Sequence, residues 1–223
     1  IQSELFQERL KKMKVSFIAV DEAHCISQWG YDFRPSYLNL SILRELKPNS
    51  SLMAVTATAT TKVVDDIQKK LSFKHTNVIR QSFKRSNIHY RVIQCENKVT
   101  VLKKVVKKEC TIIYVRSRRQ AELISEKLNQ IGISSHYYHA GLDTAYRNKI
   151  QSNWMNNQFL VMVATTAFGM GIDKADVRTV IHYDVPESIE SFYQESGRAG
   201  RDGLPSYSIS LIEMNDGENL LNR

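Results

Sequence analysis

Cysteine is scarce in this chain of 223 residues, which contains only Cys25, Cys95 and Cys110. Their spacing matches no zinc-binding motif, and three scattered cysteines do not make a disulfide framework. We therefore expect a reducing, intracellular setting. The sequence also has no run of about 18 apolar residues and no basic-then-apolar start, so we expect neither a membrane span nor a secretion signal.

Positive charge exceeds negative charge, with a formal net charge of +8 at pH 7. This excess favours a polyanionic partner, above all nucleic acid, and the alternative is an ordinary basic protein without such a partner. Residues 1–83 carry 12 Lys and Arg against 8 Asp and Glu, and residues 84–223 carry 19 against 15. Each part thus contributes +4, so the excess is not confined to a tail.

Short apolar runs alternate with amphipathic segments, which predicts an α/β fold of parallel sheets with helices on both faces. We expect strands at residues 15–20, 51–55, 77–79, 88–94, 111–115, 134–138, 160–164, 178–183 and 206–212. We expect helices at residues 3–13, 36–46, 62–71, 98–108, 118–131, 143–156 and 188–196. Thr60 or Thr61 is expected to cap the helix over 62–71. The polar, basic stretch 81–87 separates two strand–helix series, so we place the domain boundary between 1–83 and 84–223.

Stretches with unusual chemistry follow the ends of predicted strands. They are residues 21–34, 56–60, 116–119, 165–174 and those from Asp184 onward. In parallel sheets, binding sites lie at the carboxyl ends of the strands. We therefore expect these stretches to form one shared site.

An acidic pair, Asp21 and Glu22, ends the strand over 15–20. Two acids at such a position are costly unless a cation meets them. In nucleotide hydrolases, acids placed this way face Mg²⁺ and polarise the attacking water. The next segment, residues 25–35, holds three aromatic side chains and an arginine around Gly30, namely Trp29, Tyr31, Phe33 and Arg34. This composition predicts a loop whose side chains contact a flat ligand.

Two stretches offer groups for phosphate binding. Thr165 supplies a hydroxyl, and Gly169 and Gly171 allow the backbone to approach a ligand, although Gly-x-Gly after a strand can also be a simple turn. Ser117 and Arg118 open a predicted helix, which is a natural position for an anion. The alternative is a basic first turn on a solvated helix.

Arg198 and Arg201 lie three residues apart in a glycine-rich segment. Arginine makes bidentate contacts with phosphate oxygens, so this pair is a candidate phosphate clamp. The alternative is a pair of surface arginines, one of them held structurally by Glu195 or Asp202.

Other conspicuous residues have simpler interpretations. Trp154 is expected in the core. Three histidines, His136, His139 and His182, do not form a metal cluster by their spacing and are expected to be structural. Four lysines are expected on the solvated face of one helix, namely Lys103, Lys104, Lys107 and Lys108.

Taken together, the motifs resemble superfamily 2 helicases, in which they occur in this order. They are Asp-Glu-Ala-His at 21–24, Thr-Ala-Thr at 56–58, the stretch from Ala-Thr to Gly-Met-Gly-Ile-Asp at 164–173, and Gln-Glu-Ser-Gly-Arg-Ala-Gly-Arg-Asp-Gly at 194–203. Residues 25–35 resemble the aromatic-rich loop of RecQ DNA helicases, and Tyr-His-Ala-Gly-Leu at 138–142 fits the same family. The resemblance extends from about Val15 to Leu211.

The resemblance implies an ATP-dependent 3′-to-5′ DNA helicase that acts in DNA recombination and repair, with two RecA-like domains. ATP and Mg²⁺ are the implied cofactors, and single-stranded DNA and duplex junctions are the implied partners. By position, Asp21 matches the acid that holds Mg²⁺ through water, and Glu22 matches the residue that activates water. The residues matched to coupling between nucleotide and DNA are His24, Thr56, Ala57 and Thr58.

The remaining matched positions contact DNA or nucleotide. DNA contacts are implied for Trp29, Tyr31, Phe33, Arg34, Ser117, Arg118, Thr165, Phe168 and Gly169. Nucleotide contacts are implied for Gly171, Asp173, Gln194, Arg198 and Arg201, with Arg201 the preferred arginine finger. Tyr31 departs from the histidine of many family members, but tyrosine can still stack and form hydrogen bonds.

A larger departure is that nothing matches Gly-x-x-x-x-Gly-Lys-Ser/Thr. The resemblance therefore implies that this phosphate-binding loop and the adenine-reading glutamine lie upstream of Ile1. On this interpretation residues 1–83 are the C-terminal part of the first RecA-like domain, with an apolar sheet edge exposed, and residues 84–223 are the complete second domain. No zinc-binding or winged-helix module follows the core in this sequence.

Three functional hypotheses remain open. The chain belongs to a DNA helicase that needs the upstream half of its first domain for activity. Alternatively, the isolated chain is a non-catalytic module that binds single-stranded DNA. An RNA helicase is the third hypothesis, and the aromatic residues at 25–35 argue against it. A helicase of this kind is expected in the cytoplasm at the nucleoid of a bacterium, or in the nucleus of a eukaryote.

Overall fold

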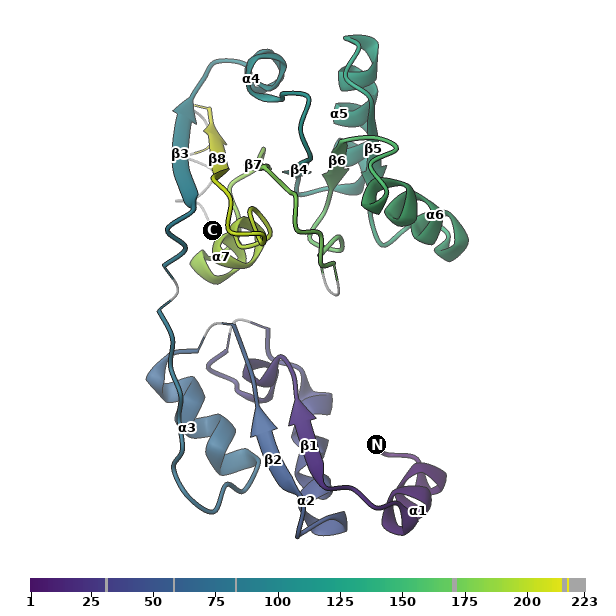
Figure 1. Ribbon diagram of the computed structural model, residues 1–223, viewed down its shortest axis with the longest axis vertical. Helices are drawn as coiled ribbons and strands as arrows, with labels where there is room; N and C mark the ends of the chain where they lie inside the picture. Colours follow the sequence, from purple (N-terminus) through teal and green to yellow (C-terminus); the bar gives the residue numbers. More distant parts are fainter. Residues whose placement is uncertain (31, 58, 83, 170–171, 214–215, 217–223) are drawn as a thin grey trace. The chain divides into compact units, whose positions relative to one another are not determined.

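The computed structural model describes the chain except for residues 31, 58, 83, 170–171, 214–215 and 217–223. The chain forms two compact units, Ile1–Ser82 and Phe83–Arg223 (Figure 1). Their division lies one residue before the predicted boundary. Within the described residues, no helix has the length and apolar character needed to cross a membrane.

The first unit is built on two parallel strands, β1 (Phe17–Val20) and β2 (Ser51–Ala54). Its helices are α1 (Glu4–Lys12), α2 (Ile42–Leu46) and α3 (Thr61–Lys70), with 3₁₀ segments η1 (Ala23–Ile26) and η2 (Pro35–Ser41). Thr60 caps α3, because its hydroxyl accepts a hydrogen bond from the Val63 N–H at 3.4 Å. The apolar face of α3 then packs Val63 and Ile67 against β1 and η1.

Two sequence predictions are wrong in this unit. Residues 35–41 form a 3₁₀ segment rather than the first turns of one helix over 36–46. Side chains there bond back to the chain, as when Ser41 Oγ donates to the Leu38 carbonyl at 3.1 Å, and such bonds compete with α-helical ones. The expected strand over 77–79 is absent, and Ile79 is 89% exposed, so no sheet edge covers it.

Apolar side chains remain uncovered on the small sheet of this unit. Phe17 in β1 and Met53 in β2 are exposed. A cavity of about 710 Å³ opens beside the end of β1. It is lined by Ala19, Val20, Asp21, Tyr37, Leu40 and Leu43, among others. The sequence predicted such apolar exposure at this sheet.

The second unit contains a parallel sheet of six strands in the order β3-β8-β7-β4-β6-β5 (Figure 1). The strands are β3 (Ile88–Gln94), β4 (Thr111–Tyr114), β5 (Ser135–Tyr138), β6 (Val161–Ala164), β7 (Thr179–His182) and β8 (Ser206–Ile212). The helices are α4 (Lys98–Val105), α5 (Arg118–Gln130), α6 (Thr144–Met155) and α7 (Ile189–Ser196). These bounds lie within three residues of the predicted ones.

Apolar residues cover both faces of this sheet. Successive residues of β4 point to opposite faces, so Ile112 joins one apolar cluster and Ile113 the other. Helices α4 and α5 pack on the Ile113 face, whereas α6 contributes the fully buried Trp154 to the Ile112 face. The expectation of a core position for Trp154 is confirmed. Continuous burial of β4, β6 and β7 is typical of a parallel sheet covered on both sides.

Candidate functional site

The acidic pair lies immediately after β1, where the chain turns sharply. Glu22 has φ 48° and ψ 42°, in the left-handed region that non-glycine residues rarely adopt. The Asp21 carboxylate accepts a hydrogen bond from the Glu22 N–H at 2.8 Å, which supports the turn. The turn directs the Ala23 N–H to the Val55 carbonyl at 3.0 Å. The end of β2 therefore fixes the backbone beside the acids.

His24 joins the ends of the two strands. Its imidazole is buried, and Nδ1 lies 2.8 Å from Thr56 Oγ1 and 3.4 Å from Glu22 Oε2. Burial lowers the pKa of His24 below its ordinary value, although the Glu22 carboxylate opposes this shift. A neutral imidazole thus connects an acid after β1 with a hydroxyl after β2.

The acid pair meets the chemical requirements of a magnesium site. Mg²⁺ takes oxygen ligands, usually one or two carboxylates together with water and substrate phosphates. Asp21 is exposed at the strand end, and Glu22 Oε2 is a buried oxygen that accepts no hydrogen bond from the described residues. Asp21 is therefore open to an incoming cation or to its water, whereas Glu22 Oε2 is shielded from solvent and lies 3.4 Å from His24 Nδ1.

The aromatic loop (residues 25–35) projects from this strand end. Gly30 is required there, because a Cβ would lie 2.5 Å from the His24 carbonyl oxygen. The Trp29 side chain is 68% exposed, and the Lys62 ammonium of α3 lies 5.3 Å from its ring centroid. Such an ammonium–indole contact is a cation–π interaction. An exposed indole is suited to stacking on a nucleic-acid base.

The rest of the aromatic loop is tied to its surroundings. Arg34 donates to Asp32 Oδ2 through Nε at 3.0 Å and Nη2 at 2.5 Å, and this holds the pKa of Asp32 below its ordinary value. Lys70 of α3 donates to the Ile26 carbonyl at 3.0 Å and lies 5.9 Å from the Phe33 ring centroid. Helix α3 therefore holds both ends of the loop.

A single group of metal-ligating side chains occurs within the described residues, formed by His24, Cys25 and Asp32. Burial raises the pKa of Cys25 to about 11, so the thiol is protonated near neutral pH. Its sulfur lies 3.8 Å from Asp32 Oδ2, and Arg34 already neutralises that carboxylate. The group is thus explained, without an ion, as a contact between the buried His24 and Cys25 and the partly exposed Asp32.

In the second unit, Ser117 and Arg118 open α5 after β4. The Ser117 hydroxyl accepts from the Gln120 N–H at 3.2 Å, and the Arg118 guanidinium packs against Gly141. Asp184 approaches the same helix start, where its carboxylate accepts from the Arg116 N–H at 2.8 Å. The Asp184 carboxylate therefore lies at the N-terminus of α5, where the sequence predicted a bound anion.

The chain crosses from β6 to β7 through residues 165–178, and Phe168 anchors this crossover. Its ring has no exposed surface and packs on Tyr138 and Trp154, with centroid distances of 4.7 and 5.3 Å. The Phe168 carbonyl accepts a hydrogen bond from Tyr114 Oη at 2.9 Å. The predicted DNA contact of Phe168 is therefore wrong for its side chain, which is part of the core.

Arg198 and Arg201 lie on the arginine turn (residues 197–203), and both contact the crossover. Arg198 Nη1 donates to the Gly169 carbonyl at 2.5 Å, and a Cβ at Gly169 would lie 2.5 Å from Arg198 Nη2. Arg201 Nη1 pairs with Asp173 Oδ1 at 2.8 Å. Because this ion pair is largely exposed, it is weak and exchangeable.

The acids expected as partners of these arginines bind elsewhere. Glu195 lies 3.1 Å from the buried His182, and Asp202 makes a bidentate pair with Arg178 at 2.6 and 2.7 Å. Neither holds Arg198 or Arg201 in the structure. The sequence-based alternative, in which Glu195 or Asp202 holds one of the two arginines, is therefore wrong.

The prediction of one carboxyl-end site is also wrong for the arginine turn. Thr165 and Ser117 follow the carboxyl ends of β6 and β4. Helix α7, however, returns the chain to the opposite edge. The turn there is bonded to the residues before β3 and β7, as when Gly200 N–H donates to the Val177 carbonyl at 2.8 Å. The crossover connects the two edges.

The structure thus brings two sets of predicted residues together, one in each unit. The first comprises Asp21, Glu22, His24, Thr56, Trp29, Phe33 and Arg34, with Ala57 after β2. The second comprises Gly169, Asp173, Arg198 and Arg201, with Thr165 at the start of the crossover and Gln194 half-buried on α7. Tyr31, Thr58 and Gly171 lie outside the described residues.

Several supporting residues were not singled out from the sequence. They are Asp32, Lys62, Lys70, Arg85, Asn87 and Arg178. The Asp-x-Arg pair at 32–34 and the lysines of α3 are visible as local charge patterns. No local signal links Arg85 and Asn87 to a turn that follows more than 100 residues later.

The fold defines the class of protein. It is a parallel-sheet α/β fold similar to the RecA-like domains of helicases. The structure of Dbp5 from S. cerevisiae bound to RNA and ADP BeF3 matches with a TM-score of 0.75, covering 98% of this chain and 59% of that one at 22% identity. At this identity the likeness concerns the fold alone.

Sequence comparisons give the family. Residues 1–67 match the DEAD/DEAH box helicase model, and residues 97–203 match the helicase conserved C-terminal domain. The chain is 45% identical to the ATP-dependent DNA helicase RecQ of Bacillus subtilis, covering 93% of this chain and 36% of that protein. It is 46% identical to the RecQ-like DNA helicase blm-1 of Caenorhabditis elegans, covering 88% and 21%. The chain therefore belongs to the RecQ family of helicases. It spans about a third or less of the length of these relatives.

Proposed function

We propose that this chain forms part of an ATP-dependent 3′-to-5′ DNA helicase of the RecQ type. The hydrogen bond between His24 and Thr56 supports this proposal most directly. It connects an acid pair suited to nucleotide hydrolysis with a second strand end, beside a loop that exposes Trp29. A change in the loop can therefore reach the acids through packed groups. The DNA helicase names of the relatives agree with this function.

The proposed chemistry assigns separate tasks to the acids and the arginines. Mg²⁺–ATP supplies the phosphoryl group that is transferred to water. Asp21 would hold the cation, through water, and Glu22 would orient and deprotonate the attacking water. Arg198 and Arg201 would stabilise charge on the phosphates, and an arginine in this role is worth roughly 10³–10⁵ in rate. The present partner of Arg201 is an exposed carboxylate and is exchangeable, whereas Arg198 donates to the Gly169 carbonyl.

The proposed DNA contacts use stacking and charge. Trp29 would stack on a base of single-stranded DNA, which contributes about 1–3 kcal/mol per base. Phe33, Arg34, Ser117, Arg118 and the backbone at Thr165 and Gly169 would complete the contacts. Single strands next to duplex junctions are the proposed substrate, recombination and repair are the proposed setting, and the nucleoid or nucleus is the proposed location.

Replacing Trp29 by alanine in the full-length protein tests this proposal. We expect the DNA concentration needed for half-maximal stimulation of ATP hydrolysis to rise by roughly tenfold or more, because a stacking contact is lost. The rate without DNA should not change. Tyr146→Ala, at an exposed aromatic residue of α6, is the matched control. Unchanged DNA stimulation in Trp29→Ala would remove the loop from the DNA site.

The chain on its own has a second candidate function. Because its sequence contains no Gly-x-x-x-x-Gly-Lys-Ser/Thr pattern, we propose that the isolated 223 residues bind single-stranded DNA without turnover. Binding should weaken steeply as salt rises, since it depends on phosphate contacts. DNA-stimulated ATP hydrolysis by the purified chain would overturn this proposal. Comparing unwinding of DNA and RNA duplexes by the full-length protein tests the RNA helicase alternative.

A further inference from the structure

The arginine turn begins where α7 ends, and its backbone carbonyls need donors from outside the helix. Arg85 provides them from the segment that precedes β3. Its guanidinium donates to the carbonyls of Gly197 at 3.4 Å, Ala199 at 3.4 Å and Gly200 at 2.8 Å. A cation at this end of a helix is also favoured by the helix dipole. One side chain thus contacts the backbone on both sides of Arg198.

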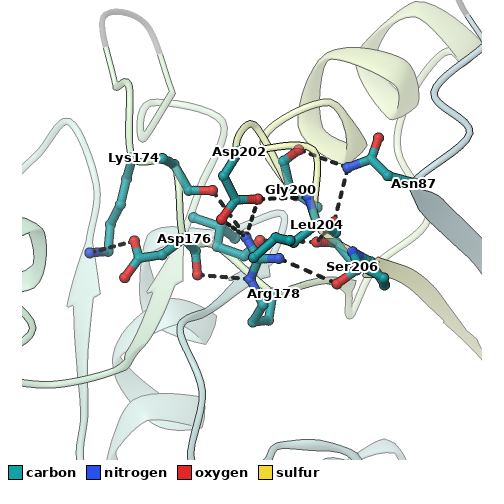
Figure 2. A network of polar contacts seen from close by, with 12 residues as sticks. Asn87, Lys174, Asp176, Arg178, Gly200, Asp202, Leu204 and Ser206 are labelled. Atoms are coloured by element: carbon teal, nitrogen blue, oxygen red, sulfur yellow. Dashed lines mark hydrogen bonds and ion pairs between the residues drawn. The ribbon is translucent and has the colours of Figure 1, made fainter.

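Asn87 holds the same turn from two residues further along. Its Nδ2 donates to the Gly200 carbonyl at 2.7 Å and to the Leu204 carbonyl at 3.0 Å (Figure 2). Its own carbonyl accepts from the Ser206 N–H at 2.8 Å, where β8 begins beside β3. Gly200 has φ +57°, and a Cβ there would lie 2.5 Å from Asn87 Nδ2. The contact is therefore closely packed as well as hydrogen-bonded.

The opposite side of the turn is held by a different kind of contact. Arg178, just before β7, pairs with both carboxylate oxygens of Asp202 and donates to the Pro205 carbonyl at 3.3 Å (Figure 2). Asp202 neutralises the charge of Arg178. Arg85, in contrast, contacts three neutral carbonyls and has no acidic partner among the described residues. Its charge therefore adds to the positive potential around Arg198 and Arg201.

We propose that Arg85 and Asn87 are positioning residues that set where Arg198 and Arg201 point toward the nucleotide phosphates. This inference depends on the proposed function, because it assumes that the two arginines act on phosphate. Arg85 and Asn87 contact the backbone on both sides of the arginines and leave the guanidinium groups themselves untouched. Losing either residue therefore misplaces the arginines while the sheet below remains folded.

Hydrogen exchange on the 223-residue chain tests whether Arg85 holds the arginine turn in place. In Arg85→Ala, the amides of the arginine turn should exchange about fivefold faster, as expected for losing hydrogen bonds worth about 1 kcal/mol. Amides of β4 and β6 should exchange as in the wild type. Arg80→Ala is the matched control, since Arg80 is an exposed arginine with no hydrogen bond or ion pair to another described residue. Equal exchange in Arg85→Ala and wild type would overturn the inference.

ATP hydrolysis by the full-length protein tests the functional half. Arg85→Ala should lower kcat on the order of tenfold to a hundredfold with little change in the KM for ATP, because a misplaced arginine is lost mainly from the transition state. Arg85→Lys should recover part of this loss, and Arg80→Ala should lose nothing. Asn87→Ala provides a second variant, chosen because Asn87 carries no charge. Its kcat should also fall.

A double variant separates positioning from general damage. If Arg85 acts through Arg201, adding Arg85→Ala to Arg201→Ala should cause less than about a threefold further loss of kcat, because coupled residues are not additive. If the double variant loses kcat by the product of the two single-variant factors, the inference is overturned. An unchanged kcat in Arg85→Ala would also overturn it. A wild-type protein without ATP hydrolysis would reject the proposed function, and the inference with it. These results are distinguishable, because only the last concerns the wild type.

Discussion

At the scale of single residues, buried polar groups determine much of the chemistry of this chain. His24 is neutral because it is buried, and it contacts both an acid and a hydroxyl. His182 is fully buried beside Glu195 and lies against the ring of Phe192, with a centroid distance of 4.9 Å. His24 connects the ends of β1 and β2, and His182 connects β7 with the helix that follows it, α7. Both histidines therefore hold local geometry.

The thiol of Cys110 makes stability sensitive to alkaline pH. Burial raises its pKa from the ordinary 9.0 to about 12, so the folded chain keeps a proton that the unfolded chain loses. The stabilisation is complete below pH 9 and decreases as pH rises toward 12, by about 1.4 kcal/mol per pH unit. Urea unfolding at pH 8 and pH 10 measures this loss, and Cys110→Ala should show less of it. Cys95→Ala, at a partly exposed thiol, should retain most of it; equal slopes in all three proteins would contradict the prediction.

At the scale of elements, the return of α7 to the amino edge of the sheet decides where the arginines lie. A helix that connects two parallel strands must run back along the sheet, so its C-terminus lies at the edge where the next strand begins. The residues before β3 and β7 lie at that edge and supply the contacts of the arginine turn. The topology therefore places Asn87 and Arg178 on two sides of one turn (Figure 2).

Two glycines of this turn allow a matched comparison. Gly200 and Gly203 both have positive φ, at +57° and +82°, but only Gly200 is crowded. A Cβ at Gly200 would lie 2.5 Å from Asn87 Nδ2 and Ser206 Oγ, whereas a Cβ at Gly203 would meet nothing within 4 Å. We expect Gly203→Ala to cost about 1 kcal/mol of unfolding free energy and Gly200→Ala at least about twice that. Denaturant unfolding measures both costs. Equal costs would contradict the expectation, because they would show that the turn can move to accommodate a Cβ at Gly200.

The elements that the sequence predicts correctly are those whose pattern is local. The strand over 88–94 and the cap of α3 were predicted because apolar periodicity and a threonine hydroxyl are local signals. The strand predicted over 77–79 does not form, because a strand also requires the edge of a neighbouring strand to pair with. Phe168 was assigned to DNA by its motif, although its ring completes the core under α6. The contacts of Arg85 join residues more than 100 positions apart, which no local pattern reveals.

At the scale of the whole molecule, net charge is divided evenly between the two parts of the chain, but buried apolar residues are not. The two parts contribute equal net charge, +4 from residues 1–83 and +4 from residues 84–223. The large apolar clusters, by contrast, belong to the sheet of the second unit, while the first unit exposes Phe17 and Met53. The second unit therefore has the more complete core.

A protein of residues 84–223 should fold without the first unit. Its sheet is covered on both faces by its own helices and crossover, so removing residues 1–83 uncovers none of the sheet packing described above. We expect one cooperative urea transition and higher solubility than that of the whole chain, because exposed apolar residues of the first unit are removed. Sedimentation and circular dichroism measure both properties. Solubility no better than that of the whole chain would contradict the prediction.

The positions of the two tryptophans give each unit its own optical reporter. Trp29 is exposed on the aromatic loop of the first unit, and Trp154 is fully buried in the second. Emission from Trp154 should shift to longer wavelength only when the second unit unfolds, whereas emission from Trp29 should be quenched when a base stacks on the indole. One fluorescence titration on the unmodified chain can therefore separate ligand binding at the loop from unfolding of the larger sheet.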